Sequence, residues 1–370
     1  MKLLYIAPRD FPRRVANRVQ TIKMAEAFSR VTDLTLCVSK LHLTRAELWQ
    51  YYGVEHPFDI REWGTSPFGR QSLYSLLPAL WQIKKIRPDV IFFREEQIGW
   101  LLSFFIRDYI YEMHAIQGPL DRYYNRLVRR SKKTIVVSEG LKQAGIARGM
   151  AEDKIEVHPA GVDLAAFDLD IDTKDARDRV GLPSDKKIVL YSGRLSAWKG
   201  VETLLMSAAY LPTDTRIVFL GGFEGEPESL QAKAVSMGLE DRIEILGTRP
   251  HGEVPLFLKA ADVLVVPNVP VTTESSEFTS PLKLLEYMSA RKPIVASDLP
   301  SLREIVDERS ATLVQPGDAK ALASGIMRAL AGGADIEKGV SLAFERASDS
   351  SWDARARRIL ASVTDEPTVS

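Results

Sequence analysis

The sequence predicts an α/β protein of two domains, each built on a parallel sheet covered by helices. The chain has 370 residues, and at about 100–200 residues per domain this length suits two domains. Short β-rich apolar runs alternate with longer amphipathic stretches, which is typical of βα units around a parallel sheet. The alternation stops at residues 161–183, an Asp-rich segment that we interpret as a linker, and then restarts.

The expected strands of the first half are Lys2–Ala7, Leu34–Ser39, Val90–Phe93, Tyr109–Glu112 and Thr134–Ser138. Those of the second half are Ile188–Ser192, Arg216–Gly221, Ile243–Leu246, Val263–Pro267 and Pro293–Ser297. The expected helices are Val19–Arg30, Leu73–Arg87, Asp121–Arg130, Glu139–Gly145, Val201–Leu211, Glu228–Met237, Val254–Ala260, Pro281–Ser289 and Ala319–Leu330. Ligands of open parallel sheets bind at the carboxyl ends of the strands, so the cleft between the two sheets is the expected ligand site.

Composition narrows the class of protein. Hydrophobic residues make up 45% and charged residues 26% of the chain, which excludes a disordered or fibrous protein. The single cysteine, Cys37, lies in an apolar run and is expected in the core of a protein from a reducing compartment. No export signal or membrane-spanning run is visible, so we expect a cytoplasmic protein, or one peripheral on the inner face of a membrane.

The net charge of zero hides an asymmetry. Residues 1–165 hold 25 Lys or Arg and 18 Asp or Glu, whereas residues 166–370 hold 24 and 31, so the halves carry +7 and −7. Such a difference indicates an anionic ligand or surface for the first half, although two solvated faces of opposite charge would give the same count.

The most informative segment joins a buried strand to a helix. Gly193 ends the strand, and Arg194 and Lys199 follow in the loop before the helix. This order puts a guanidinium and an ammonium group at the carboxyl edge of the sheet, where together they suit a diphosphate. The alternative is a pair of solvated loop charges.

A second segment favours the same ligand. Ser280 is a good N-cap and Pro281 a good first helical residue, so a helix is expected to start there with free N–H groups that suit a phosphate. Lys283 adds a cation on the first turn. Glu286 suits the two hydroxyls of a ribose, although taken alone it is more typical of a solvated helix charge.

His114 follows an expected strand. It is either an ordinary structural histidine or a side chain that forms a hydrogen bond with a substrate. His158 is interpreted as structural, because Pro159 and Gly161 follow it closely. The five His and one Cys show no metal-ligand spacing, and we expect no metal site. No Gly-x-Gly-x-x-Gly follows the first strand, which argues against a nicotinamide dehydrogenase.

These segments together resemble the GT-B glycosyltransferases of family 4, which are retaining enzymes that use nucleotide-sugar donors. Five strings carry the resemblance, in the family's order: residues 111–114, 136–141, 158–163, 193–200 and 280–297. The resemblance implies two Rossmann-like domains that face each other across a cleft, with a C-terminal helix returning to the first. We therefore expect an acceptor-binding domain at 1–165, a nucleotide-sugar-binding domain at 166–345 and a returning helix within 346–370, where Trp352 is an aromatic anchor.

The same resemblance implies roles for individual residues. Arg194 and Lys199 would bind the donor diphosphate, and Glu286 the nucleotide ribose. The residues implied to offer backbone groups to the phosphates or the sugar are Ser280, Pro281 and Leu282. His114 would contact the donor sugar near the anomeric carbon, and with Arg194 and Lys199 it forms the expected catalytic set, while Thr248 and Arg249 fall where the family contacts the base.

Two features depart from the family. Many members carry a first glutamate where this chain has Phe278, with Glu277 one residue away, which puts the usual contact to the donor-sugar hydroxyls in doubt. The loop after the first strand lacks the usual glycines and is rich in arginine; there Asn17 is expected to cap the next helix, and Asn17 and Arg18 to meet phosphate or acceptor. The alternative for this loop is a solvated basic segment.

The resemblance implies a metal-independent retaining transfer of a hexose to a saccharide or lipid-linked acceptor, as in cell-surface polysaccharide biosynthesis, with no cofactor and no nucleic acid. The positive first half favours an anionic acceptor. Basic and aromatic residues at 100–105 and 121–133 suggest peripheral contact with a membrane, although a buried helix with a basic outer face explains them nearly as well. A nucleotide-sugar epimerase of the same fold and a catalytically silent binding protein are the alternatives.

Overall fold

The computed structural model describes residues 1–13, 16–65, 71–116, 118, 120–271 and 282–364. The chain divides into two compact units. Unit 1 comprises residues 1–161 together with the end of the chain from Trp352, and unit 2 comprises residues 162–351. The divisions therefore fall at 161 and 351 rather than at the expected 165 and 345, because Val162 pairs with Ser351 in a short β-bridge that belongs to unit 2.

Unit 1 is built on a seven-stranded parallel sheet with the order β3-β2-β1-β4-β5-β6-β7. Its strands are β1 (Lys2–Phe11), β2 (Asp33–Leu41), β3 (Asp59–Glu62), β4 (Val90–Phe93), β5 (Tyr109–Met113), β6 (Ser131–Val136) and β7 (Ile155–Val157). Its helices are α1 (Ala16–Ser29), α2 (Arg45–Tyr52), α3 (Gln71–Ile86), α4 (Glu96–Leu102), α5 (Asp121–Arg130), α6 (Glu139–Ala147) and, at the end of the chain, α16 (Trp352–Ala361). Cys37 is buried in β2.

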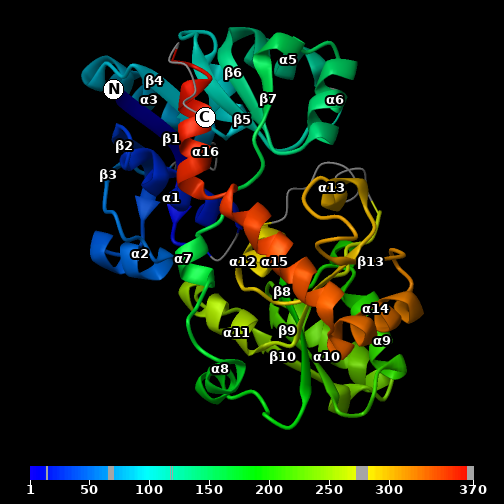
Figure 1. Ribbon diagram of the computed structural model, residues 1–370. Helices are drawn as coiled ribbons and strands as arrows, with labels where there is room; N and C mark the ends of the chain where they lie inside the picture. The colour runs from blue at the N-terminus through cyan, green and yellow to red at the C-terminus, as the bar shows by residue number, and fades with distance from the viewer. Residues whose placement is uncertain (14–15, 66–70, 117, 119, 272–281, 365–370) are drawn as a thin grey trace. The chain divides into compact units, whose positions relative to one another are not determined.

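The last helix completes unit 1. Figure 1 shows α16, in red, lying beside α1, in blue, and the two helices pack against each other. Trp352 begins α16 and is 7% exposed, and its ring lies so close to Gly161 that a Cβ at Gly161 would come within 2.5 Å of it. The contact fixes the start of α16 against the last residue of the first segment.

Unit 2 is built on a six-stranded parallel sheet with the order β10-β9-β8-β11-β12-β13. Its strands are β8 (Lys187–Gly193), β9 (Thr215–Gly221), β10 (Ile243–Gly247), β11 (Val263–Val266), β12 (Ile294–Ser297) and β13 (Thr312–Val314). Its helices are α7 (Leu164–Phe167), α8 (Thr173–Val180), α9 (Val201–Ser207), α10 (Glu226–Ser236), α11 (Val254–Ala260), α12 (Leu282–Ser289), α13 (Pro300–Arg303), α14 (Ala319–Ala331) and α15 (Ala334–Ser348).

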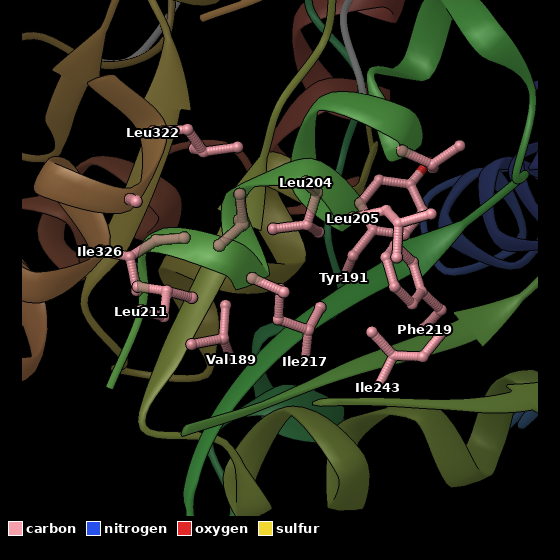
Figure 2. Packing of buried hydrophobic residues seen from close by; sticks show 14 of the residues in the cluster. Val189, Tyr191, Leu204, Leu205, Leu211, Ile217, Phe219, Ile243, Leu322 and Ile326 are labelled. Carbon is pink, nitrogen blue, oxygen red and sulfur yellow. The ribbon is translucent and has the colours of Figure 1, made fainter. Parts of the chain in front are cut away.

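The hydrophobic core of unit 2 lies between the sheet and two helices. Figure 2 shows Leu204 and Leu205 of α9 packed over Val189 of β8 and Ile217 of β9, with Ile326 of α14 beside them. Each such leucine, when fully buried, stabilises the fold by roughly 1.5–3 kcal/mol. This layer supports the strands whose carboxyl ends carry the candidate site.

The structure confirms the α/β class with two parallel-sheet domains and adds elements that were not expected. The expected linker holds two short helices, α7 and α8. The first strand continues to Phe11 rather than ending at Ala7, because a bulge between Ala7 and Asp10 lets it keep pairing with β2. Three additional strands, β3, β7 and β13, lie at sheet edges, where short strands need no continuous apolar run.

The packing of α16 leads to a prediction. Replacing Trp352 by Ala should lower the free energy of unfolding by about 3–5 kcal/mol, because a buried aromatic side chain is removed. Urea unfolding followed by far-UV circular dichroism measures the change. The control is Arg357→Ala on the exposed side of the same helix, expected within about 0.5 kcal/mol of wild type. Equal midpoints for the two variants would show that α16 adds little to unit 1.

Candidate functional site

The candidate site of unit 2 lies at the carboxyl edge of β8. Two glycines bring backbone segments unusually close there. Gly200 has φ +73°, and a Cβ at this position would come 1.7 Å from the carbonyl oxygen of Pro267, just beyond β11. Gly221 at the end of β9 has φ +121°, and its Cβ would come 2.4 Å from the carbonyl oxygen of Gly193. Only glycine fits such contacts, so the loop that carries Arg194 and Lys199 is held against its neighbours.

Arg194 forms an ion pair with a carboxylate at this edge of the sheet. Its Nη2 lies 2.8 Å from Oε1 of Glu226, while 60% of the Arg194 side chain stays exposed. The other carboxylate oxygen of Glu226 accepts hydrogen bonds from the backbone N–H of Leu195 at 2.9 Å and of Phe223 at 2.7 Å. Burial opposes ionisation of Glu226, but Arg194 and these two N–H groups lower its pKa. Glu226 therefore ties the loops after β8 and β9 together and holds Arg194 at the surface.

Lys283, on the first turn of α12, carries a buried amine. It is 9% exposed, and its Nζ lies 3.9 Å from the centroid of the Tyr191 ring. Among the described residues, no group accepts a hydrogen bond from this Nζ. Burial, and after it the charge of Lys199, holds the pKa of Lys283 well below its usual value. A buried amine beside another cation is stabilised when an anion binds next to it.

Glu286 follows one turn later on α12. Its side chain is 12% exposed, and Oε1 lies 3.9 Å from Nε2 of His251. Burial raises the pKa of Glu286 to about 7, and the nearby Lys283 only partly offsets this rise. Near neutral pH the carboxyl group is thus poised between its two protonation states, in contact with little water and able to accept hydrogen bonds from hydroxyl groups.

The candidate residue of unit 1, His114, is part of a buried charge network. Its Nε2 lies 2.8 Å from Oε1 of Glu112 and 2.9 Å from Nε of Arg94. The second carboxylate oxygen of Glu112 lies 3.2 Å from Nη1 of Arg355 on α16. Glu112 and Arg355 are 3% and 1% exposed, whereas the His114 side chain is half-buried. The imidazole therefore joins a buried carboxylate to the surface of unit 1.

The protonation of this network follows from its charges. Burial opposes ionisation of Glu112, but Arg355, Arg94 and His114 hold its pKa well below the usual value. Burial, followed by the charge of Arg94, lowers the pKa of His114. The carboxylate is therefore ionised and the imidazole neutral at neutral pH.

The loop after β1 differs from the expectation. Asn17 does not cap α1, because the helix begins at Ala16 and Asn17 is its second residue. Its Oδ1 instead accepts a hydrogen bond from Arg18 Nη1 at 3.0 Å. Arg18 is 7% exposed, donates from Nε to the carbonyl oxygen of Asp10 at 3.2 Å and lies over the ring of Phe11. Arg18 is thus buried rather than a solvated charge, and its role toward a phosphate or an acceptor stays a prediction.

Two family models match the chain, one in each half. The model described as Glycosyltransferase Family 4 matches residues 24–166, and the model described as Glycosyl transferases group 1 matches residues 172–341. Together they cover most of both units. The chain belongs to the GT-B glycosyltransferases of family 4.

Relatives of this family 4 chain include two D-inositol 3-phosphate glycosyltransferases. The one from Xylanimonas cellulosilytica is 33% identical over 45% of the chain and 40% of that protein. The one from Acidothermus cellulolyticus is 34% identical over 57% of the chain and 48% of that protein. These alignments span about half the length of the curated relatives. Among solved structures, HepE from Anabaena in complex with UDP is similar in fold, with a TM-score of 0.79, 20% identity and coverage of 99% of this chain and 100% of that one.

The structure brings some of the expected donor-site residues of this family 4 member together. Lys199 is close enough to Lys283 to lower its pKa, and Tyr191, which lies under Lys283, donates a hydrogen bond from its hydroxyl to the carbonyl oxygen of Arg194 at 2.6 Å. Leu282 begins α12. Thr248 follows β10 and donates from Oγ1 to the carbonyl oxygen of Gly222 at 2.7 Å.

The remaining expected residues are exposed, structural or outside the described part of the chain. Arg249 is exposed directly after Thr248. Ser280 and Pro281 lie outside the described residues, as do Glu277 and Phe278, so the expected N-cap and the missing first glutamate are not described. His158 has a structural position, since its backbone oxygen accepts from Arg355 Nη2 at 3.2 Å.

Sequence reasoning missed four residues that shape the two sites: Glu226, His251, Glu112 and Arg355. Glu226 stands at the first position of α10, which the sequence pattern started two residues later. Glu112 lies within the string that pointed to His114, but an isolated strand carboxylate gives no sign of its partner. Arg355 is recognisable only once α16 is placed beside α1.

No described helix is long and apolar enough to span a membrane. No group of three or more His, Cys, Asp or Glu side chains is arranged to hold a metal ion within the same part of the chain.

The raised pKa of Glu286 leads to a prediction for stability. Its carboxyl keeps its proton in the folded state up to about pH 7, whereas an unperturbed glutamic acid loses it near pH 4.5. The folded state therefore binds more protons between these values, and stability should fall by about 3 kcal/mol from this group as the pH rises through the window. Glu286→Gln should remove that decline.

Urea unfolding at pH 4.5 and pH 8 tests this prediction. The control is Glu228→Gln on the exposed face of α10, which should leave the decline as in wild type. If the wild-type protein and Glu286→Gln lose the same stability between the two pH values, the buried carboxyl does not titrate as described.

Proposed function

We propose that the chain transfers a hexose from a nucleoside-diphosphate-sugar donor to a saccharide or lipid-linked acceptor, with retention at the anomeric carbon. The observation that carries the proposal is the set of cations at the carboxyl edge of β8. Arg194 is exposed there, and Lys199 and Lys283 lie close enough to disfavour each other's charge. A polyanion such as a diphosphate stabilises a set of neighbouring cations of this kind.

The proposed reaction uses these cations at the leaving group. The bond between the anomeric carbon and the β-phosphate oxygen breaks, and its electron pair stays on the departing nucleoside diphosphate. The acceptor hydroxyl oxygen bonds to the anomeric carbon on the same face, and its proton passes to the departing phosphate oxygen. Arg194, Lys199 and Lys283 stabilise the charge that develops on the diphosphate, so no bound metal is required. Glu286 accepts hydrogen bonds from the ribose hydroxyls, and His114 contacts the donor sugar.

The relatives support a starting choice of donor and acceptor. HepE has been solved with UDP and with UDP-glucose, so uridine nucleotides are the first donors to test. The curated relatives that act on inositol 3-phosphate carry an anionic acceptor in their names. Residues 1–165 carry a net charge of +7, which suits an anionic acceptor bound by unit 1 in cell-surface polysaccharide biosynthesis.

Two alternatives share the same anion site. A nucleotide-sugar epimerase would need a further acid–base set near the sugar, and a silent binding protein would need none. Incubation with labelled UDP-sugars, with and without inositol phosphates, separates the three. Sugar transfer or slow donor hydrolysis supports the transferase, an isomerised donor supports the epimerase, and binding without turnover supports the silent protein.

We also propose that unit 1 contacts an anionic membrane surface. α3 packs on α4 and α4 on α5, so the three helices form one layer. That layer and the segment after α4 expose large apolar side chains and cations, which we call the aromatic–basic face. Its apolar members are Leu73, Tyr74, Leu77, Trp81, Phe104 and Phe105. Its exposed cations are Lys84, Lys85, Arg107 and Arg129.

Charge and aromatic content favour a lipid surface as the partner of this face. Lys85 Nζ lies 4.7 Å from the centroid of the Trp81 ring, and the guanidinium carbon of Arg126 lies 3.7 Å from that of Phe104. Aromatic side chains beside cations match the boundary of an anionic bilayer, where apolar groups enter the headgroup region and the cations meet phosphates. Such a contact would bring a lipid-linked acceptor to unit 1.

The anion site predicts a loss of activity in two variants. Arg194→Ala and Lys199→Ala should each lower kcat/KM for the donor by about 100-fold or more, because each removes a charge that stabilises the leaving diphosphate. Initial rates with a nucleotide sugar, and the thermal shift produced by the matching nucleoside diphosphate, measure the effect. Lys187→Ala, at the opposite end of β8, is the control and should retain both. A wild-type rate in either variant would contradict the assignment of that residue to the diphosphate site.

The aromatic–basic face predicts binding to vesicles. The wild-type protein should sediment with vesicles of phosphatidylglycerol and phosphatidylcholine at low salt and less so at high salt. The double variant Leu77→Ser/Trp81→Ser should sediment several-fold less, because it removes exposed apolar side chains without touching the core. Val235→Ser, an exposed apolar residue on α10, is the control. Failure of the wild-type protein to sediment at low salt would overturn the membrane contact.

A further inference from the structure

The carboxylate of Glu226 is saturated with hydrogen bonds at the carboxyl edge of β8. Its Oε1 accepts from Nη2 of Arg194 at 2.8 Å and from Nε of the same side chain at 3.3 Å. Its Oε2 accepts from the backbone N–H of Leu195 at 2.9 Å and of Phe223 at 2.7 Å. An ionised carboxylate offers about four lone-pair sites, so these donors can occupy all of them. The carboxylate is therefore held in one orientation between the loops after β8 and β9.

Arg194 is fixed by these contacts along one edge of its guanidinium group. Nε and Nη2 both face Glu226, whereas Nη1 makes no hydrogen bond or ion pair with the described residues. The ring centroid of Phe223, a residue that is 53% exposed, lies 5.5 Å from the guanidinium carbon, within the range of a cation–π contact. The backbone is held as well, since the hydroxyl of Tyr191 donates to the carbonyl oxygen of Arg194 at 2.6 Å. The guanidinium is thus held in place while its second edge is unused by the described part of the chain.

A fixed arginine binds an anion more tightly than a mobile one. A mobile arginine side chain loses rotamer freedom when it binds an anion, and that loss weakens binding. In this chain the contacts with Glu226 and Phe223 remove the freedom of Arg194 before any anion binds. Immobilising one such side chain in advance raises affinity by up to about tenfold.

The charge of Glu226 acts in the opposite direction. Burial opposes its ionisation, but Arg194 and the two backbone N–H groups lower its pKa, so the carboxylate is ionised and repels a diphosphate. For one charge of the diphosphate roughly 8 Å away in water, such repulsion lowers affinity about two- to threefold. Salt and the ion pair with Arg194 reduce it further. The two effects of Glu226 on anion binding thus differ in sign, and positioning is the larger.

We propose that Glu226 is a positioning residue, which holds Arg194 through Nε and Nη2 and leaves the edge with Nη1 for a diphosphate. The identity of the anion rests on the proposed glycosyl transfer, in which Arg194 stabilises the leaving nucleoside diphosphate. A guanidinium presents more than one edge that forms paired hydrogen bonds, so the diphosphate need not displace Glu226. Glu226 therefore stays paired with Arg194 while the diphosphate binds.

The sign of the effect on affinity tests the positioning without any turnover. Isothermal titration calorimetry measures the affinity for UDP and for inorganic pyrophosphate. Glu226→Gln keeps the size of the side chain, but its single oxygen cannot accept from all four donors, and we expect both probes to bind about three- to tenfold more weakly. Loss of a repelling charge alone would strengthen binding. Unchanged or tighter binding of both probes by Glu226→Gln would therefore overturn the proposal.

Two further variants separate charge from geometry. Glu224→Gln is the matched control, because it removes an equal charge from an exposed residue of the same loop that is not among the described contacts of Arg194. It should change affinity by less than about threefold and only toward tighter binding. Glu226→Asp keeps the charge but draws the carboxylate back, so it should weaken both probes at least as much as Glu226→Gln. If Glu226→Gln fails to fold, Glu226→Asp decides, and wild-type affinity in that variant would overturn the positioning.

A double-mutant cycle with Arg194→Ala distinguishes positioning from a purely structural role. In an Arg194→Ala background, Glu226→Gln should leave affinity unchanged or slightly higher, because only the repulsion remains to be removed. An equal loss of affinity in both backgrounds would show that Glu226 acts through the loops rather than through Arg194, and would overturn the proposal.

The same titrations distinguish a failure of the positioning from a failure of the proposed function. If the wild-type protein binds neither UDP nor pyrophosphate, the diphosphate site itself is wrong, and the positioning toward a diphosphate is wrong with it. If Arg194→Ala weakens binding and Glu226→Gln does not, the diphosphate site stands and the positioning alone is overturned.

Discussion

The carboxylate of Glu112 is the charge around which unit 1 is assembled. It sits at the end of a central strand, where burial alone would drive it to take up a proton. Breaking such a buried pair by removing one partner costs about 3–5 kcal/mol, far more than an exposed ion pair contributes. The partner that prevents this, Arg355, comes from the last helix, and the same guanidinium binds two backbone oxygens at the end of the first segment. One buried charge therefore joins the sheet, the last helix and the histidine at the surface.

In unit 2 the notable charged groups lie at the carboxyl edge of the sheet. Its carboxyl edge holds Lys199 and Lys283, and the charge of Lys199 lowers the pKa of Lys283, while Arg194 pairs with Glu226. Lys283 is buried without a hydrogen-bonding partner among the described residues, and Glu286 is buried with its proton poised near neutrality. In unit 1 the buried carboxylate of Glu112 is thus paired with cations of the same unit, whereas we propose that the cations of unit 2 bind a polyanion.

Sequence patterns predicted the elements of the fold that are buried strongly enough to form a recognisable apolar run. Central strands are buried on both faces and are continuous apolar runs, so they were predicted, whereas β3, β7 and β13 are short edge strands with partly exposed residues. Arg194, Lys199 and Lys283 were found because they follow a strand end or begin a helix. No role for Arg355 could be predicted, because its role depends on an ion pair with Glu112, which lies about 240 positions earlier in the chain. The contact of Arg18 with Phe11 could not be predicted, because Phe11 belongs to an unexpected extension of β1.

The bridge between Val162 and Ser351 makes unit 2 an insertion within unit 1, with its two ends side by side. During synthesis the sheet of unit 1 is made first, but the helix that neutralises Glu112 is made only after all of unit 2. Until then the strand carries a carboxylate that lacks its main counter-ion, and α1 lacks the helix that packs against it. Unit 2 holds its own sheet, helices and core in one continuous segment, so it can fold in the meantime. The order of the chain thus makes unit 1, although it begins first, the last to be finished.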